Sequence, residues 1–452
     1  MALRFRKIMD VQCGLRYLYS DLRLASSLSK SIIIDSKLES SEAKIEQMYK
    51  ELAEFIILLS PSGKLQGLTN KLSLHLSHLR DIRNSLKRIS EGAIADDIEL
   101  FEIKSLSMIN EKVRELLSPL SIQSITLPDL SDLCTLLDPE GAGINSFYIY
   151  DSYNEELRKL REKIKVGSDY DNELCYRTSI IENQIREYLS KEINKDIDQL
   201  EASISNLTKI DILVAKAEQA LRLGLTIPVV SREKISYKAL FNPEVVELLT
   251  KEGKSYQKTD ISFTSHKPLL ITGSNMGGKS LTLKTIALCQ FLFQAGFAIP
   301  AQECEISPVK EIMLSTGDEE DYRKGLSSFS AEVKRIDSII KRVRDGEKLL
   351  VLIDEPARTT NPYEGAALAS SLLEILFLSK GFSVMTSHYT ISDNKCDRLR
   401  VKGFYDGKMD YTLIIDSGTK TPAEALIIAE SLDADKEWIE LARMTMNKNT
   451  KQ

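Results

Sequence analysis

The first half of the chain is dominated by apolar residues that recur every three or four positions. Residues 21–38, 72–89 and 99–117 each place one apolar stripe where a helix would present it to a neighbour. Residues 173–222 add alternating charges to this pattern, which predicts long helices that form a helical core or coiled coil, with a binding role as the alternative. Residues 128–152 interrupt the pattern with proline, glycine and aromatic residues, and predict a turn with a short strand or hairpin.

After Leu225, short apolar runs replace the long helical patterns. Strands are predicted at residues 226–230, 261–264, 381–388 and 411–415. Closing helices are predicted at residues 423–429 and 436–444. This change predicts two domains, an all-helical domain at residues 1–222 and an α/β domain with a mixed, mostly parallel sheet at residues 223–452.

The composition is that of an ordinary globular protein, with 452 residues, enough for two or three domains. A net charge of −6 does not favour nucleic-acid binding, although a local basic face remains compatible with it. Six scattered cysteines without a CxxC pair indicate reduced thiols. The first residues lack the apolar core of a signal peptide, and the apolar runs are too short to span a bilayer. We therefore expect a cytoplasmic protein with no membrane contact.

The most informative motif is a glycine-rich loop between the apolar run 268–271 and a helical pattern at residues 281–293. Small residues let backbone N–H groups point at phosphate oxygens, and the helix N-terminus adds its dipole. Lys279 is expected to reach the β- and γ-phosphates and Ser280 to ligate Mg²⁺. The sequence therefore predicts binding of ATP and Mg²⁺. The GxxxxGK[ST] spacing of this phosphate-binding loop is carried by Gly273, Ser274, Asn275, Met276, Gly277, Gly278, Lys279 and Ser280.

A second predicted strand, residues 348–355, begins at Lys348 and continues as an apolar run that ends in Asp354 and Glu355. A continuous apolar run is typical of a strand buried on both faces of a parallel sheet, and such sheets bind ligands at their carboxyl ends. We expect Asp354 to serve the Mg²⁺ shell and Glu355 to polarise the attacking water as general base. Two acids that cap the next helix are the alternative, which pairing with the loop at Lys279 disfavours.

Three further segments carry candidate chemistry. His388 ends a predicted strand and is placed to sense a γ-phosphate, with a satisfied core or surface histidine as the alternative. Residues 321–332 place Ser327 and Ser328 before a helix, where free N–H groups favour a phosphate or where either serine is a plain N-cap. Residues 356–365 follow the acid pair and either relay nucleotide state to a partner subunit or simply connect to the next helix.

In the same order, these motifs resemble those of the MutS family of mismatch-repair ATPases. Residues 272–280 are similar to the family's Walker A motif, with Ser274 where proline is usual. Residues 325–332 resemble its signature loop, and residues 386–389 its switch histidine segment. Residues 354–365 resemble its Walker B motif and the loop that follows, with Pro356 and the pair Asn361-Pro362 as departures.

The resemblance implies an ABC-like P-loop ATPase domain behind a helical core and lever domain, closer to the branch of the family that does not read mismatches. It implies a homodimer in which Ser327 and Ser328 of one subunit complete the ATP site of the other. It also implies an aromatic residue over the adenine, for which we select Tyr256. Residues 165–215 are too short for full clamp helices at about 1.5 Å per residue, and we expect neither a mismatch-reading domain nor an Smr-type nuclease tail.

Two functions are compatible with these features. The first is a dimeric DNA-binding ATPase of mismatch repair or recombination. The second is a MutS-like ATPase that remodels a protein client, because the loop after Glu355 also resembles that of ATPases that reactivate cobalamin-dependent aminomutases. A structural dimer with slow turnover is a third possibility. A basic surface on the helical arms would favour DNA, and an acidic one a protein client.

Overall fold

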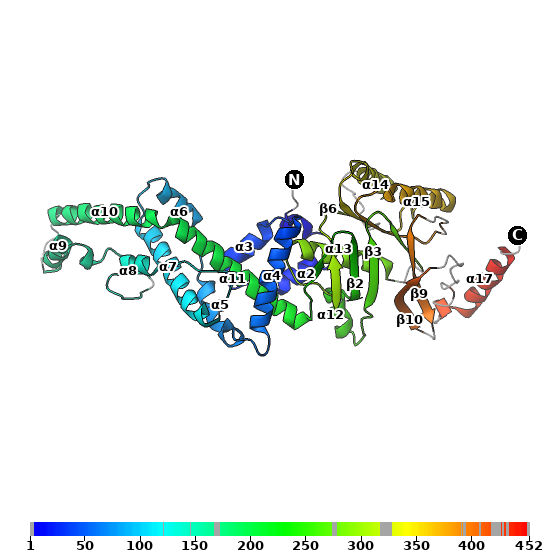
Figure 1. The fold of residues 1–452 in the computed structure, drawn as a ribbon, viewed down its shortest axis with the longest axis horizontal. Helices are drawn as coiled ribbons and strands as arrows, with labels where there is room; N and C mark the ends of the chain where they lie inside the picture. The colour runs from blue at the N-terminus through cyan, green and yellow to red at the C-terminus, as the bar shows by residue number, and fades with distance from the viewer. Residues whose placement is uncertain are drawn as a thin grey trace. The chain divides into compact units, whose positions relative to one another are not determined.

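A computed structural model of the chain describes residues 4–120, 122–144, 146–166, 172–273, 278–316, 328–389, 391, 395–405, 408–416, 426, 429–430 and 434–449. The chain falls into two units (Figure 1). The α/β unit comprises Met1–Leu22, Ser36–Lys50 and Gln219–Gln452, and the helical unit comprises Arg23–Asp35 and Glu51–Glu218. In the described ranges, no helix is long and apolar enough to cross a membrane. The domain division near residue 222 stays a prediction.

The helical unit is made of helices that each bury an apolar stripe. Leu100, Ile103 and Val113, for example, line the buried side of one helix at the predicted spacing. The pattern at residues 72–89 forms two helices separated by a short turn. The helices of this unit are α3 (Ser27–Asp35), α5 (Thr69–Ser77), α6 (Arg83–Ser90), α7 (Asp97–Leu117), α9 (Glu155–Val166) and α10 (Asn172–Lys195), with 3-10 turns η1 (Gln66–Leu68) and η2 (Ser118–Leu120). Two further helices, α4 (Glu42–Leu59) and α11 (Ile197–Leu223), have residues in both units.

The strand or hairpin predicted at residues 128–152 is wrong. The described residues there form α8 (Ser131–Leu137) and the start of the 3-10 turn η3 (Asp151–Tyr153), and they contain no strand. Leu133 and Leu137 lie one helical turn apart and are both buried, which favours the helix. Tyr150 has its hydroxyl 2.9 Å from Lys104 Nζ, so this strand-favouring aromatic is held by side-chain contacts instead of a strand ladder.

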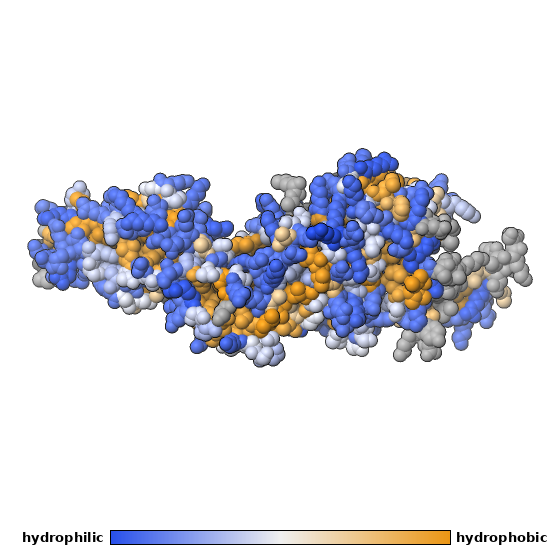
Figure 2. Space-filling view, in the orientation of Figure 1, coloured by the Kyte–Doolittle hydropathy of each residue, from blue (hydrophilic) through white to orange (hydrophobic). Residues whose placement is uncertain are grey.

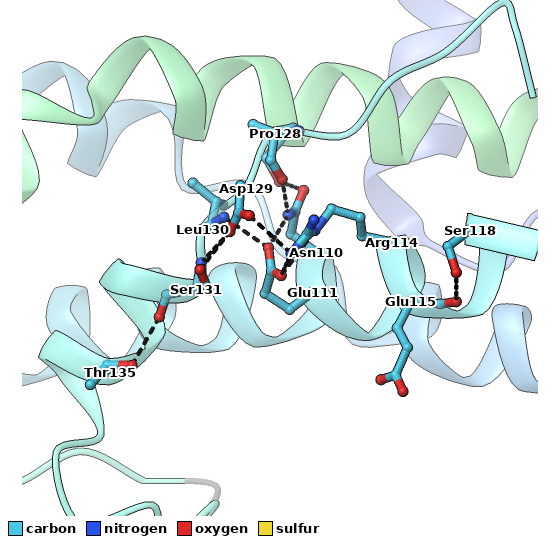
Figure 3. Close-up of polar contacts among 11 residues, drawn as sticks. Asn110, Glu111, Arg114, Glu115, Ser118, Pro128, Asp129, Leu130, Ser131 and Thr135 are labelled. Atoms are coloured by element: carbon cyan, nitrogen blue, oxygen red, sulfur yellow. Dashed lines mark hydrogen bonds and ion pairs between the residues drawn. The ribbon is translucent and has the colours of Figure 1, made fainter.

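Polar side chains of α7 hold the loop that leads into α8 (Figure 3). The Glu111 carboxylate accepts a hydrogen bond from the Leu130 N–H at 2.8 Å and another from Arg114 Nε at 3.0 Å. Asn110 donates to the Pro128 carbonyl at 2.8 Å. These contacts satisfy the Glu111 carboxylate within the α7–α8 connection.

The α/β unit contains a six-stranded sheet in the order β10-β9-β4-β8-β7-β6. Every neighbouring pair is parallel except β9 and β10, which are antiparallel. The predicted mixed, mostly parallel sheet is therefore confirmed. Its strands are β4 (Leu269–Thr272), β6 (Glu311–Ser315), β7 (Leu349–Ile353), β8 (Phe382–Thr386), β9 (Asp397–Tyr405) and β10 (Lys408–Ile415).

Helices pack on this sheet and explain why β7 is apolar throughout. Leu349, Val351 and Ile353 form one buried cluster with Ile339 of α14 (Ser328–Arg344) and Leu373 of α15 (Pro362–Leu376). The alternate residues of β7 point to the opposite face of the sheet, and α13 (Lys279–Gln294) contacts β6, β7 and β8. A strand covered on both faces needs apolar residues at every position.

A second, four-stranded sheet has the order β1-β5-β2-β3. The N-terminal segments pack beside the end of α13, where Tyr49 donates hydrogen bonds to the Phe293 and Phe297 carbonyls. The predicted helix at residues 423–429 lies almost wholly outside the described residues. The remaining elements are α1 (Phe5–Ile8), α2 (Leu15–Asp21), β1 (Val229–Val230), β2 (Lys234–Leu240), α12 (Pro243–Lys251), β3 (Thr259–Thr264), β5 (Glu303–Ile306) and α17 (Lys436–Asn449).

Candidate active site

The glycine-rich loop begins where β4 ends and finishes where α13 begins. Gly273 and Gly278 have φ values of 126° and 71°, a backbone region that disfavours side chains. A Cβ on Gly273 would lie 3.1 Å from the Val401 Cβ, so β9 also requires glycine there. Gly278 is the N-cap of α13 and brings no side-chain acceptor to its first N–H groups, which suits an anion. Four predicted phosphate contacts lie outside the described residues: Ser274, Asn275, Met276 and Gly277.

Lys279 connects this loop to the acid pair after β7. Its ammonium donates to the Gly273 carbonyl at 2.6 Å and lies 3.0 Å from Glu355 Oε1. Both side chains of this ion pair are buried, where opposite charges stabilise each other and an unpaired charge is costly. β8 lies between β4 and β7 in the sheet, so Lys279 reaches across one strand to bring the two predicted motifs together.

The backbone after β7 is unusual at Glu355, and the two neighbouring carboxylates have different partners. Glu355 has a φ of 44°, an uncommon conformation that surrounding contacts must hold. Its N–H donates to Thr386 Oγ1 at 3.0 Å, and the Thr386 hydroxyl donates to Asp354 Oδ1 at 2.6 Å. Thr386, at the end of β8, therefore fixes both the Glu355 backbone and the Asp354 carboxylate.

Ala357 continues this unusual backbone with a φ of 60°. Its N–H donates to Glu332 Oε1 at 3.2 Å, and its carbonyl accepts from the Tyr389 hydroxyl at 2.9 Å. Burial raises the pKa of Glu332, opposed by the Ala357 N–H and the nearby guanidinium groups. Burial also raises the pKa of the Tyr389 phenol, with smaller contributions from the charges of Glu332 and Glu355. The loop after the acid pair is thus held from α14 and from the segment after β8.

His388 lies beside the proposed base. Its Nδ1 is 3.9 Å from Glu355 Oε2, and about a third of its side chain is exposed to solvent. Its ring lies 4.1 Å from the Tyr389 ring, centroid to centroid. The structure therefore brings His388, Glu355 and Lys279 together.

The residues that were predicted to serve Mg²⁺ also flank this centre. Ser280 is exposed in the first turn of α13, and Asp354 is half-buried beyond β7. The part of the chain that the structure describes has no cluster of three histidine, cysteine or acidic residues that would hold a metal by itself. Mg²⁺ commonly takes one or two protein oxygens and completes its shell with phosphates and water, so Ser280 and Asp354 fit that ion.

Two tyrosines bear on the predicted adenine contact. Tyr256 is half-buried, and burial raises the pKa of its phenol, opposed by hydrogen bonds from the Asn242 backbone and the Thr285 side chain. Its role over the adenine stays a prediction. Tyr411 on β10 lies beside the loop, because its ring is 3.3 Å from the place that a Cβ of Gly278 would take.

The described residues do not test the two serines that were predicted to act in a partner's site. Ser327 lies outside the described residues, and Ser328 begins α14 with its side chain likewise outside them. Their role in a partner's site stays a prediction.

Sequence reasoning assigned no role to Glu332, Thr386, Tyr389 or Tyr411. The first three lie inside motif segments, and their position there was the feature of the sequence that could have indicated a role. Their hydrogen bonds depend on backbone angles at residues 355 and 357 that no pattern of residues predicts. Tyr411 is placed by the pairing of β10 with β9, which is a long-range feature.

Comparison with known proteins agrees with this geometry. Residues 269–403 match the family model of MutS domain V. A protein named Endonuclease MutS2 from Ligilactobacillus salivarius is 34% identical over 54% of this chain and 30% of its own length. Endonuclease MutS2 from Caldanaerobacter subterraneus subsp. tengcongensis is 28% identical over 84% of this chain and 50% of its own. That from Acetivibrio thermocellus is 34% identical over 56% and 32%. The chain thus spans half or less of these relatives.

Proposed function

On the premise that this chain carries a MutS domain V, which is an ATPase domain, we propose that it binds and hydrolyses ATP with Mg²⁺ at the site around Lys279. The observation that supports this most is the buried contact between Lys279 and Glu355. It joins a glycine-rich loop, suited to phosphates, to a strand end that carries two carboxylates. Either motif alone could be a plain loop or a helix cap. The 3.0 Å distance between Lys279 Nζ and Glu355 Oε1 disfavours both alternatives, because it brings the two motifs together.

In this proposal, Asp354 and Ser280 hold Mg²⁺, which neutralises charge on the phosphates. Glu355 is the general base for the attacking water, and His388 senses the γ-phosphate. Tyr256 contacts the adenine, with Tyr411 as a second aromatic candidate because of its place over Gly278. The proposed phosphate contacts are Gly273, Ser274, Asn275, Met276, Gly277, Gly278, Lys279 and Ser280.

Lys279 and Glu355 exchange partners during the proposed reaction. A triphosphate carries more negative charge than one carboxylate, so it draws the Lys279 ammonium toward its oxygens. Glu355 then loses its counter-ion and is free to accept a proton from water. Thr386 keeps Asp354 and the Glu355 backbone in place while this occurs, because it contacts both.

We further propose that the chain works as a homodimer, with Ser327 and Ser328 completing the partner's ATP site. Figure 2 shows hydrophobic residues at the surface over α14 and α15, the helices next to this segment. Val333, Leu368 and Leu378 are among the exposed apolar residues there. Exposed apolar patches of this kind mark protein contacts.

The partner of the helical unit is proposed to be DNA, because relatives of the chain carry the name endonuclease. One observation favours the protein-remodelling alternative. Most basic side chains of α9 and α10 are neutralised by ion pairs, so these arms have no basic stripe in their described residues. The pairs are Arg158–Glu155, Arg161–Glu182, Arg177–Glu156, Arg186–Asp97, Lys191–Glu187 and Lys195–Glu192.

Steady-state ATPase assays of the wild type and Glu355→Gln test the catalytic proposal. We expect the variant to bind a fluorescent ATP analogue normally and to lose hydrolysis, and normal turnover would show that Glu355 is not the base. Branched and mismatched duplexes, added across a salt series, test the partner. ATPase stimulation that weakens as salt increases supports DNA as the partner. An absence of stimulation by every duplex favours the protein client.

A further inference from the structure

A pocket of about 480 Å³ opens in the helical unit between α5 and α7, and none of its lining residues is assigned to ATP. This volume is in the range of small-ligand sites. One side of α7 forms a wall, because Phe101, Ser105, Met108 and Lys112 recur at intervals of three and four. All four are half-buried or exposed, so the wall is open to solvent.

The ionisable residues that line this pocket are all basic. His75 and His78 come from the end of α5, Arg80 follows them, and Lys112 faces them from α7. The Arg80 guanidinium is 3.7 Å from Glu102, a long contact in which Arg80 is exposed and Glu102 is half-buried. Lys112 forms no ion pair with any described residue. Positive charge therefore converges here without a carboxylate in the lining.

Lys104 also lines the pocket, and its charge is already balanced. Its ammonium is 3.2 Å from Asp138 Oδ1 and donates to the Tyr150 hydroxyl at 2.9 Å. Lys104 therefore fixes the floor of the pocket rather than offering a charge to a ligand. The rim of the pocket is formed by His75, His78 and Lys112, and Lys112 is its cation without an acidic partner among the described residues.

The rim groups repel one another. Burial lowers the pKa of His75, and the charges of Lys112 and His78 lower it further. A bound anion relieves this repulsion, whereas an apolar ligand does not. Among the acids of α7, Glu102 faces Arg80 and Glu99 is engaged by Arg88. Glu111 is engaged by Arg114 and the Leu130 N–H (Figure 3).

We propose that this pocket binds a nucleotide phosphate, with the base or sugar against Phe101 and Ile144. The phosphate lies at the basic rim, where the Arg80 guanidinium and the Lys112 ammonium form charge-assisted hydrogen bonds and the histidine imidazoles offer N–H donors. The Arg80 guanidinium lies 5.7 Å from the Phe101 ring centroid, so a cation and an aromatic face are side by side. This combination is common where proteins hold single nucleotides of a strand. Most basic side chains of α9 and α10, by contrast, are paired with acids.

The ligand has two sources, a free nucleotide or one residue of a nucleic-acid strand. The free-nucleotide arm does not depend on ATP hydrolysis, and the strand arm rests on the proposed DNA binding. Calorimetry on the full chain separates them with thymidine 5′-monophosphate and a six-nucleotide oligothymidylate as probes. Binding at the Lys279 site is distinguished by the variants, because substitutions at Lys112 and Phe101 leave that site unchanged.

We expect Lys112→Glu to weaken binding of at least one probe by about tenfold or more, because a phosphate contact becomes a repulsion. Phe101→Ala tests the apolar wall and should weaken the same probe. Lys30→Glu on α3 is the matched control, because it makes the same charge change at an exposed residue that does not line the pocket. Urea unfolding of each variant confirms that the helical unit is intact.

Binding of the monophosphate that Lys112→Glu weakens assigns the pocket to a free nucleotide. Binding of the oligonucleotide alone, with the same dependence, assigns it to a strand. Equal oligonucleotide binding by all variants overturns the pocket and leaves the proposed DNA binding standing. Monophosphate binding without oligonucleotide binding keeps the pocket and counts against DNA. No binding of either probe, or equal weakening by Lys30→Glu, overturns the inference.

Discussion

The Glu332 carboxylate, near the start of α14, accepts a hydrogen bond from the Ala357 N–H at 3.2 Å. Ala357 has a φ of 60°, so this acceptor helps to hold a strained loop beside the proposed base. Glu332→Ala should lower kcat by about tenfold and leave ATP affinity nearly unchanged, because the loop is released but the phosphate loop is untouched. Glu332→Gln retains an oxygen acceptor and is the matched control. Equal losses of kcat in both variants would contradict a positioning role.

Glu332 also gives a pH prediction. Its pKa is raised by burial, so the folded protein holds this proton more tightly than the unfolded chain does. The stability that Glu332 contributes is fully present below the unfolded pKa and is lost as pH rises through the folded pKa. Urea unfolding across that interval should show wild-type stability falling relative to Glu332→Gln. A difference in unfolding free energy that does not change with pH would refute this assignment.

The buried pair of Lys279 and Glu355 should be energetically coupled. Lys279→Met should destabilise the protein without nucleotide by roughly 3–5 kcal/mol, because it leaves the Glu355 carboxylate buried and unpaired. Adding Glu355→Gln should recover part of this loss. A double-mutant cycle of urea unfolding measures the coupling, for which we expect more than about 1 kcal/mol. Additive effects of the two substitutions would mean that the pair does not form in solution.

Thr386→Val tests the hydroxyl that joins β7 to β8. The valine has nearly the same shape, yet it leaves the Glu355 N–H without its acceptor and Asp354 without its donor. We expect a loss of about 1–3 kcal/mol in unfolding free energy, together with a lower ATPase rate. Thr386→Ser keeps the hydroxyl and should retain most of both quantities. A valine variant as active as the serine variant would show that the hydroxyl bridge is dispensable.

Gly365 in α15 allows Tyr389 to reach the Ala357 carbonyl. A Cβ on Gly365 would lie 2.4 Å from the Tyr389 hydroxyl, which is closer than any real contact. Gly365→Ala should therefore displace Tyr389 and reduce ATPase activity to about the level of Tyr389→Phe, which lacks the donor. Gly67→Ala is the control, since no atom lies within 4 Å of the place that a Cβ would take there. Unchanged activity in Gly365→Ala would show that Tyr389 does not position this loop.

Local patterns predicted the elements that carry the motifs. β4, α13, β7 and β8 were predicted because each is a dense apolar run or a strong amphipathic pattern beside a recognisable motif. β2, β5, β6 and β9 received no prediction, because their short or mixed patterns gain meaning only from partners distant in sequence. The hairpin at residues 128–152 failed for a related reason. Tyr150 favours a strand by residue type. Its position is instead set by hydrogen bonds of its hydroxyl with Lys104 and Asp138, which are distant in sequence.

The candidate site shows the same limit. The identity of Lys279, Asp354, Glu355 and His388 followed from spacing, because phosphate loops and acidic strand ends use few residue types. The direct contact of Lys279 with Glu355 did not follow, because it depends on the strand order that puts β8 between β4 and β7. The pocket at α5 and α7 was equally invisible, since His75 and Lys112 meet only after the helices pack.

The matched charges of α9 and α10 have a consequence for how this protein responds to its surroundings. Exposed pairs such as Lys191–Glu187 contribute little to stability, and the fold of α10 rests instead on the buried side chains of Ile185, Leu189 and Ile193. Added electrolyte screens these pairs but leaves the apolar contacts in place. The helical structure of α9 and α10 should therefore change little between low and high salt concentration.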